Sequence, residues 1–485
     1  MQNGKFFSLL YTLNEKEVQV FHKHLKQLYG KELISLRAFE YAKDLYLSGP
    51  QRRKPDMVHA HRRAYQSALS DQEKERKKML KNTLNLFHDL HLRLRDFLLF
   101  EKVRDDSLES QALWLEVLQE RKLQDEYSKQ AARFYTETKA APKIDAKKYL
   151  LEMTASYFQY QQLALVRPTP DTGALQQCLE TLEICAETIR IKLACQLANL
   201  RKMQPPKVST TLPAPPLELP EARIIKSSPL LALYCDIYQL IEKEEEEYFN
   251  RIQAVFVEET KRLDPDELHG ALGYLHNYAA IQIRNGAENN IGKRIHELNQ
   301  HGRHYGLFDR PEGMSDTQFT NIINLACSVK DYDWATSFME EHQRALPEKI
   351  RADIVLLAGA SIAFTEAQFE RVLMLLGPIK FKHLHHTIRA RSLMLRSYLE
   401  LNNDDALEDC LTFESMLERN RDPRTDAVEA MLASVRIIKM FILKKEDQET
   451  ILERIEKAPT LYFKPWLKKQ AAEYKATYAP HKRSG

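Results

Sequence analysis

Apolar residues recur along nearly the whole chain at intervals of three and four positions, beginning with Phe6 and Leu9. This spacing places the apolar side chains on one face of an α-helix. Asn14 and Glu17 form a capping pair, in which the amide caps the helix and the acid reaches back to it. The first helix is therefore expected to end near Thr12, where a second helix begins.

The same periodicity predicts helices along the rest of the N-terminal half, and stop signals such as Gly49-Pro50 mark their ends. These helices are expected over residues 33–47, 70–102, 107–121, 124–139, 143–166 and 172–203. From residue 107 onward the helices are expected to form antiparallel pairs, 107–121 with 124–139 and 143–166 with 172–203.

A repeated layout appears in the C-terminal half, where a helix, a short polar turn and a second helix follow one another three times. The turns fall at residues 331–333, 366–368 and 402–404, so the period is about 35 residues. Capping boxes are predicted at Ser315 with Gln318 and at Thr450 with Glu453. A repeat of this length is typical of stacked helical hairpins, since each hairpin can bury its two apolar faces only against neighbours.

The fold class predicted is all-α, with an N-terminal helical bundle followed by an irregular α-solenoid of antiparallel helix pairs. Six prolines within residues 204–220 are incompatible with a helix interior. The expected segments are a basic helical bundle (1–105), helical hairpins (106–203), a proline-rich loop or linker (204–227), helical repeats (228–470) and a basic tail (471–485).

Composition agrees with the all-α class and indicates the cellular compartment. The 485 residues include only 14 glycines, which argues against a hairpin-rich β fold. No apolar run approaches the roughly 20 residues that span a bilayer. None of the six cysteines has a partner at the spacing of a zinc or redox motif, so a reducing compartment, the cytoplasm, is expected.

The repeated layout resembles that of tetratricopeptide-type α-solenoids over roughly residues 265–460. Small residues such as Ala326, Ala335 and Ala358 stand where neighbouring helices must approach. The full consensus is not met in any unit, so the resemblance is to the superfamily of degenerate repeats. The N-terminal half, including Leu108-Glu109-Ser110-Gln111, resembles a group of bacterial helical proteins, and that resemblance implies no activity.

Candidate catalytic or metal-binding chemistry is sparse. His383, His385 and His386 stand together, but two-residue spacing turns side chains about 200° apart on a helix. His88/His91 and His301/His304 share a face without an obvious Cys, Asp or Glu to complete a metal site. Glu244 to Glu247 circle a helix rather than converge. With no phosphate loop or nucleophile elbow, we expect no enzyme, no cofactor and no metal.

A protein-interaction scaffold or adaptor is therefore the expected function, with another protein or peptide as the partner. Its groove would be lined by the first helices of the pairs, where Tyr274, Asn277 and Tyr278 are candidate partner-binding residues. Packing between repeats would account for them equally well.

The alternative is a nucleic-acid-binding regulator. Residues 1–100 carry a net charge of +8, against −10 for residues 101–450 and +5 for residues 451–485. Residues that could contact phosphates are Arg52, Arg53, Lys54, Arg62 and Arg63. Acidic residues interleave with the lysines and arginines of residues 74–81, which reduces the local field, and no distinct recognition helix is evident.

Overall fold

A computed structural model describes most of the chain, in the residue ranges that follow. They are 3–29, 33–48, 55–104, 107–166, 172–203, 218–284, 290–310, 313–381, 383–421, 426–458 and 461–474. These residues form 23 α-helices and no strand, apart from one isolated backbone bridge between Ile144 and Leu263. The predicted all-α class is confirmed. Among the helices of these ranges, none is both long and apolar enough to cross a membrane.

The chain divides into two compact units, each of which contains more than one of the segments expected from the sequence. The first unit comprises residues 1–138 and 161–170, and the second comprises residues 139–160 and 171–485. Residues 204–217 of the expected linker and 475–485 of the expected tail lie outside the described residues.

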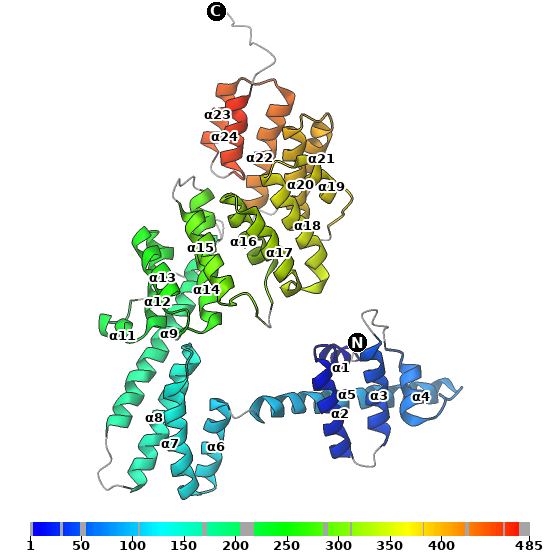
Figure 1. The fold of residues 1–485 in the computed structure, drawn as a ribbon. Helices are drawn as coiled ribbons and strands as arrows, with labels where there is room; N and C mark the ends of the chain where they lie inside the picture. The colour runs from blue at the N-terminus through cyan, green and yellow to red at the C-terminus, as the bar shows by residue number, and fades with distance from the viewer. Residues whose placement is uncertain are drawn as a thin grey trace, which may run out of the picture. The chain divides into compact units, whose positions relative to one another are not determined.

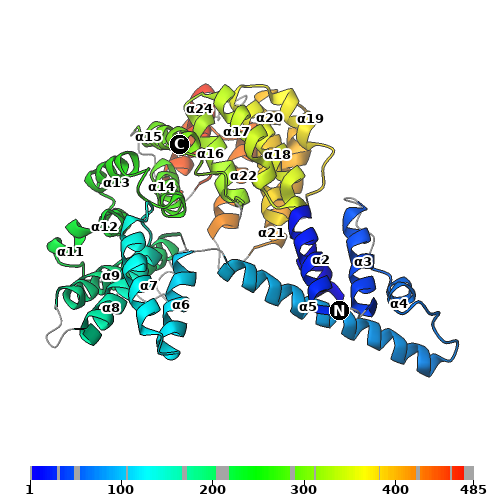
Figure 2. The same cartoon turned by 60° about the horizontal axis from the view of Figure 1, so that its bottom comes forward.

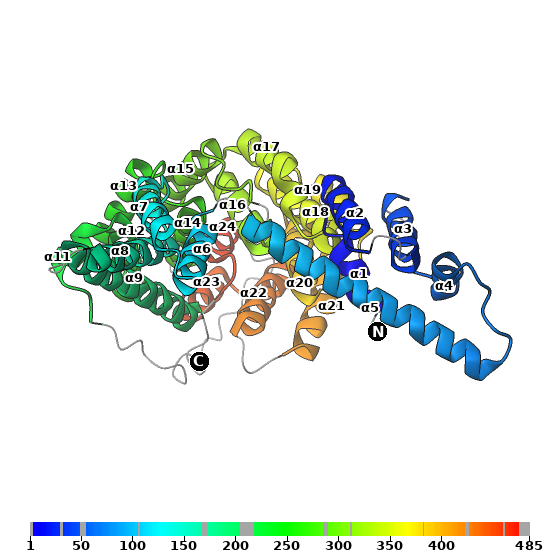
Figure 3. The same ribbon diagram turned by 90° about the horizontal axis from the view of Figure 1, so that it is seen from below.

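The first unit is built around one long helix, α5, which the shorter helices α1 to α4 contact (Figure 3). Its helices are α1 (Asn3–Leu10), α2 (Glu15–Tyr29), α3 (Leu33–Leu47), α4 (Met57–Tyr65), α5 (Glu73–Arg104), α6 (Leu108–Glu120) and most of α7 (Gln124–Ala140). Aromatic rings fill the bundle core, as where Phe21 lies edge-on to Phe39 at 5.2 Å and Phe87 contacts Phe7 at 5.1 Å. The predicted cap is confirmed, because Glu17 N–H donates to Asn14 Oδ1 at 2.9 Å and Asn14 N–H donates to Glu17 Oε2 at 2.7 Å.

The second unit contains the solenoid. Its helices are part of α8 (Ala146–Val166), α9 (Gly173–Met203), α11 (Ala222–Ser227), α12 (Pro229–Lys243), α13 (Glu246–Glu258), α14 (Pro265–Arg284), α15 (Ile291–His304), α16 (Asp316–Ser328), α17 (Tyr332–His342), α18 (Glu348–Thr365), α19 (Phe369–Leu376), α20 (Leu384–Glu400), α21 (Ala406–Arg419), α22 (Asp426–Leu443), α23 (Gln448–Lys457) and α24 (Lys464–Glu473). A short 3₁₀ turn, Gln343–Ala345, follows α17.

Consecutive helices of this unit pack as antiparallel pairs from α12/α13 to α22/α23, with α24 packed on the last pair (Figures 1 and 2). The first helices α12, α14, α16 and α18 each contact the next first helix, and second helices such as α17 and α19 contact the first helix that follows. Each pair therefore covers the apolar face that its neighbour leaves open, as the 35-residue period predicts.

The three turns predicted within these pairs share one backbone conformation. Lys330, Ala367 and Asn402 all have positive φ, of 63°, 59° and 51°. After each of them the chain closes a bond that spans five residues, as from Gln368 N–H to the carbonyl of Ala363 at 2.8 Å. This is the Schellman end, in which a left-handed residue satisfies helix carbonyls and reverses the chain.

Replacement of the left-handed alanine by glycine should stabilise the protein. A Cβ disfavours this conformation, whereas glycine adopts it freely, so we expect Ala367→Gly to raise the free energy of unfolding by about 0.5–1 kcal/mol. Asn402→Gly is the matched control, because asparagine already tolerates positive φ. Thermal unfolding of the two variants checks this, and equal shifts would contradict it.

One predicted cap is wrong. Thr450 does not begin a helix but lies inside α23, where its N–H donates to Asp447 Oδ1 at 2.7 Å. Asp447 has the extended backbone that a cap requires, and its carboxylate is a stronger acceptor than a hydroxyl. Of the other predicted capping box, one hydrogen bond is present, since Gln318 N–H donates to Ser315 Oγ at 3.2 Å.

Candidate functional site

A cavity of about 540 Å³ lies within the second unit. It is bounded by α9, α14 and α16 and is lined by Gln196, Asn199, Leu200, His269, Gly270, Gly273, Tyr274, His276, Asn277, Ser315, Thr317, Gln318 and Asn321. Five of these side chains are carboxamides, three are aliphatic hydroxyls or a phenol, and no Asp, Glu, Lys or Arg is among these described residues. Such a lining offers many neutral hydrogen-bond donors and acceptors in one place.

Helix α14 makes the floor of the cavity through two glycines. A Cβ at Gly273 would meet no heavy atom within 4 Å, so the backbone faces open space there. A Cβ at Gly270 would lie 3.6 Å from Tyr234 Oη. One turn on, Asn277 donates from Nδ2 to Asn199 Oδ1 at 3.1 Å and joins α14 to α9. The cavity therefore exists where α14 lacks side chains, and amides rim it.

A buried ionic cluster fixes α14 beneath this floor. Glu267, which is 7 % exposed, accepts from Lys192 Nζ of α9 at 2.6 and 2.7 Å and from Tyr234 Oη of α12 at 2.6 Å. Burial and the adjacent carboxylate raise the pKa of Tyr234 well above its ordinary value, so the phenol stays a donor. Three helices are thereby held at one point close to the cavity.

His276, which lines the cavity, makes the stability of the fold depend on pH. Its Nε2 lies 2.9 Å from Asn299 Oδ1, and burial lowers the pKa of the ring to about 4 from the usual 6.5. The folded state thus keeps the ring neutral, while the unfolded state takes up a proton below pH 6.5. This stabilising contribution is complete above pH 6.5 and is lost as the pH falls towards 4.

We expect His276 alone to cost about 3 kcal/mol of unfolding free energy between pH 6.5 and 4, because the unfolded ring takes up a proton over this range while the folded ring, with its pKa of about 4, stays largely neutral. Urea unfolding across this range measures the loss. His276→Gln can donate to Asn299 but does not titrate, so its profile should be flatter by that amount. An unchanged slope in this variant would contradict the assignment.

The structure separates the three predicted partner-binding residues. Tyr274 and Asn277 line the cavity, while Tyr278 lies outside it, packed on Phe249 at 6.1 Å with its hydroxyl 3.4 Å from the Glu244 carbonyl. The periodicity placed all three on α14, but the turn of the helix directs Tyr278 toward α13.

The predicted phosphate contacts are described in part. Arg52, Arg53 and Lys54 lie outside the described residues. Arg62 and Arg63 are exposed in the last turn of α4, where the Arg63 guanidinium is 2.9 Å from Asp44 Oδ2. That carboxylate compensates part of the local positive charge.

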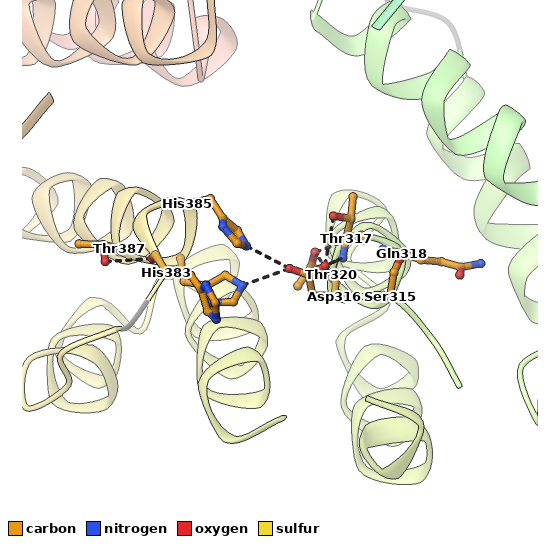
Figure 4. Close-up of polar contacts among 9 residues, drawn as sticks. Ser315, Asp316, Thr317, Gln318, Thr320, His383, His385 and Thr387 are labelled. Atoms are coloured by element: carbon orange, nitrogen blue, oxygen red, sulfur yellow. Dashed lines mark hydrogen bonds and ion pairs between the residues drawn. The ribbon is translucent and has the colours of Figure 1, made fainter. Parts of the chain in front are cut away.

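A second polar cluster lies at the other side of the first turn of α16. Asp316 is directed toward α20, while Gln318 points to the opposite side (Figure 4). Asp316 Oδ2 lies 3.1 Å from Nε2 of both His385 and His386. The histidine set was visible in the sequence, but the carboxylate that meets it comes from about 70 residues earlier, and no local spacing could indicate it.

The amide lining was also missed by sequence reasoning. Gln196, Asn199 and Asn321 occupy ordinary helical positions, and the sequence predicts a role for Gln318 only in a capping box. Their convergence requires α9, α14 and α16 to be adjacent. Comparison with family models, curated proteins and solved structures gives no match for this chain.

Proposed function

We propose that the chain is a non-enzymatic interaction scaffold, built on tetratricopeptide-like helical repeats, that binds a polypeptide in the cavity between α9, α14 and α16. The observation that carries this proposal is the neutral, amide-rich lining contributed by α9 and by α14 and α16, the first helices of two successive pairs. The period of about 35 residues and the shared turn conformation support the family likeness. All six cysteines are free thiols, which suits the proposed cytoplasmic location.

A polypeptide suits this lining for a chemical reason. Each peptide group presents one N–H and one carbonyl and carries no charge, and a carboxamide can pair with both. A phosphate or other anion would require cationic partners, which the described lining does not contain. Tyr274 adds a rigid aromatic surface of the kind that dominates binding energy at interfaces.

Site-specific photocrosslinking in the native cell tests the proposal. A benzophenone amino acid placed at Asn321 in the cavity should form adducts with a defined polypeptide. The matched control position is Met374 on α19, which is 69 % exposed and outside the cavity. Adducts of equal yield at both positions would contradict a cavity-directed partner.

A blocking variant strengthens this test. Leucine is a good helix former, and the open space at Gly273 accepts its side chain, so Gly273→Leu should fill the cavity without disturbing the core. We expect the Asn321 adducts to fall to the level of the Met374 control while the far-ultraviolet circular dichroism is unchanged. Adducts that survive the block would place the partner elsewhere.

Nucleic-acid binding through the basic N-terminal region is the competing proposal. Titration of the full chain with a short duplex at low salt distinguishes the two. Binding that weakens steeply as salt rises would support the phosphate contacts proposed at Arg62 and Arg63.

A further inference from the structure

The cluster of Asp316, His385 and His386 joins the first helices of two different pairs, α16 and α20. One ligand-type atom from each side chain lies within 4.8 Å of the other two, and both Asp316–histidine separations are 3.1 Å. The two imidazole rings have centroids 3.9 Å apart. Three donor atoms of the kinds that bind transition metals therefore converge on one point (Figure 4).

These separations are close to those of a coordination sphere. Ligand atoms at about 2.0–2.1 Å from a tetrahedral Zn²⁺ lie roughly 3.3 Å from one another. The observed 3.1 Å separations differ from this by a few tenths of an ångström, which a small rotation of the rings supplies. We propose that Asp316, His385 and His386 form a binding site for a divalent transition metal, Zn²⁺ in the first place.

The geometry places one carboxylate oxygen between the two imidazoles. Asp316 Oδ2 is the shared partner of His385 Nε2 and His386 Nε2, each at 3.1 Å. His386 is fully buried, so packing holds its ring in this position before any ion binds.

Metal binding would fix the tautomer of His386. A metal bond at Nε2 requires the ring proton on Nδ1, which is buried and has no hydrogen-bond partner among the described residues. This unsatisfied donor costs part of the binding free energy. The hydrogen bond to Asp316 is exchanged for a metal bond at the same atom.

The three donor atoms determine which metal ions the site would bind and how many coordination positions stay open. Imidazole nitrogens suit Zn²⁺, Ni²⁺ or Cu²⁺, whereas Mg²⁺ and Ca²⁺ prefer oxygen ligands alone. Three protein ligands leave room for water or a group from outside. Bound metal would link α16 to α20 and stabilise the solenoid.

The test is calorimetric titration of the full chain, freed of metal by a chelator, with Zn²⁺. We expect one Zn²⁺ site per chain. His385→Gln should lower its affinity for Zn²⁺ by at least about tenfold, because loss of a group that only hydrogen-bonds to a metal ligand already lowers metal affinity by this much. His385 is 60 % exposed on its side chain, so this variant should fold normally. Asp316→Asn keeps the shape of the third ligand, removes its charge and should weaken the site comparably.

His304→Gln is the matched control, since His304 is an exposed histidine outside the cluster. Saturating Zn²⁺ should raise the unfolding temperature of the wild type and of this control by the same amount. It should not change the unfolding temperature of His385→Gln. Absence of Zn²⁺ binding by the wild type, or wild-type affinity in both ligand variants, would overturn the proposal. The cluster would then serve only as a set of hydrogen bonds between α16 and α20. Neither result depends on the polypeptide partner of the cavity.

Discussion

Phe338→Ala should divide the unfolding of the solenoid into two transitions. Phe338 is fully buried in α17, where its ring lies 5.1 Å from Trp334 and 5.2 Å from Phe308. Phe308 follows α15, so this contact joins the α14/α15 pair to the α16/α17 pair. Removing the ring leaves a cavity and costs about 3–5 kcal/mol.

The division follows from the one-dimensional character of stacked repeats. Each pair depends on its neighbours, so a weak interface in the middle lets the two sides unfold separately. Urea unfolding followed by circular dichroism should therefore show a lower midpoint with a smaller apparent slope, or two resolved steps. Met374→Ala, at a side chain that is 69 % exposed in the same unit, should change the midpoint little. A uniform shift with an unchanged slope would contradict the proposed weak interface.

Glu267→Ala should be similarly damaging, for an electrostatic reason. The substitution removes the partner of Lys192 and the acceptor of Tyr234 Oη at once. Loss of one member of a buried ion pair costs about 3–5 kcal/mol, and the partial exposure of Lys192, at 29 %, favours the lower end. The free energy of unfolding in urea measures this loss.

Two companion variants isolate the cause. Glu267→Gln keeps an acceptor for Tyr234 and removes the charge, so we expect an intermediate loss. Asp266→Ala removes the neighbouring acid, which is 61 % exposed in its pair with Arg310, and should cost under about 1 kcal/mol. Equal losses for Asp266→Ala and Glu267→Ala would show that burial of the cluster does not matter.

The local part of the fold could be predicted because its causes are local. Residues 33–47 form a helix at the expected bounds, and the turns at residues 331–333, 366–368 and 402–404 fall between paired helices. Apolar spacing and turn chemistry act over a few residues, so they can be read directly. The Thr450 cap is wrong because the helix begins three residues earlier, where the carboxylate of Asp447 accepts the N–H of Thr450.

The candidate sites could be predicted only where one helix supplies the residues. Tyr274 and Asn277 share a face of α14, so the periodicity placed them together, and both line the cavity. The histidines at positions 383, 385 and 386 were apparent as a group, yet helical spacing argued against a shared ligand. Helical spacing describes one helix in isolation, whereas the carboxylate of Asp316 comes from another helix.

Sequence alone determined that this protein is helical, that its C-terminal half is made of hairpins about 35 residues apart, and where those hairpins turn. Periodicity and capping are properties of contiguous residues, so they survive without tertiary structure. Only the tertiary structure decided which side chains meet across helices. The meeting of Asp316 with His385 and His386, and of Asn199 with Asn277, depends on how rigid helices stack, and stacking is set by packing among residues far apart in the chain.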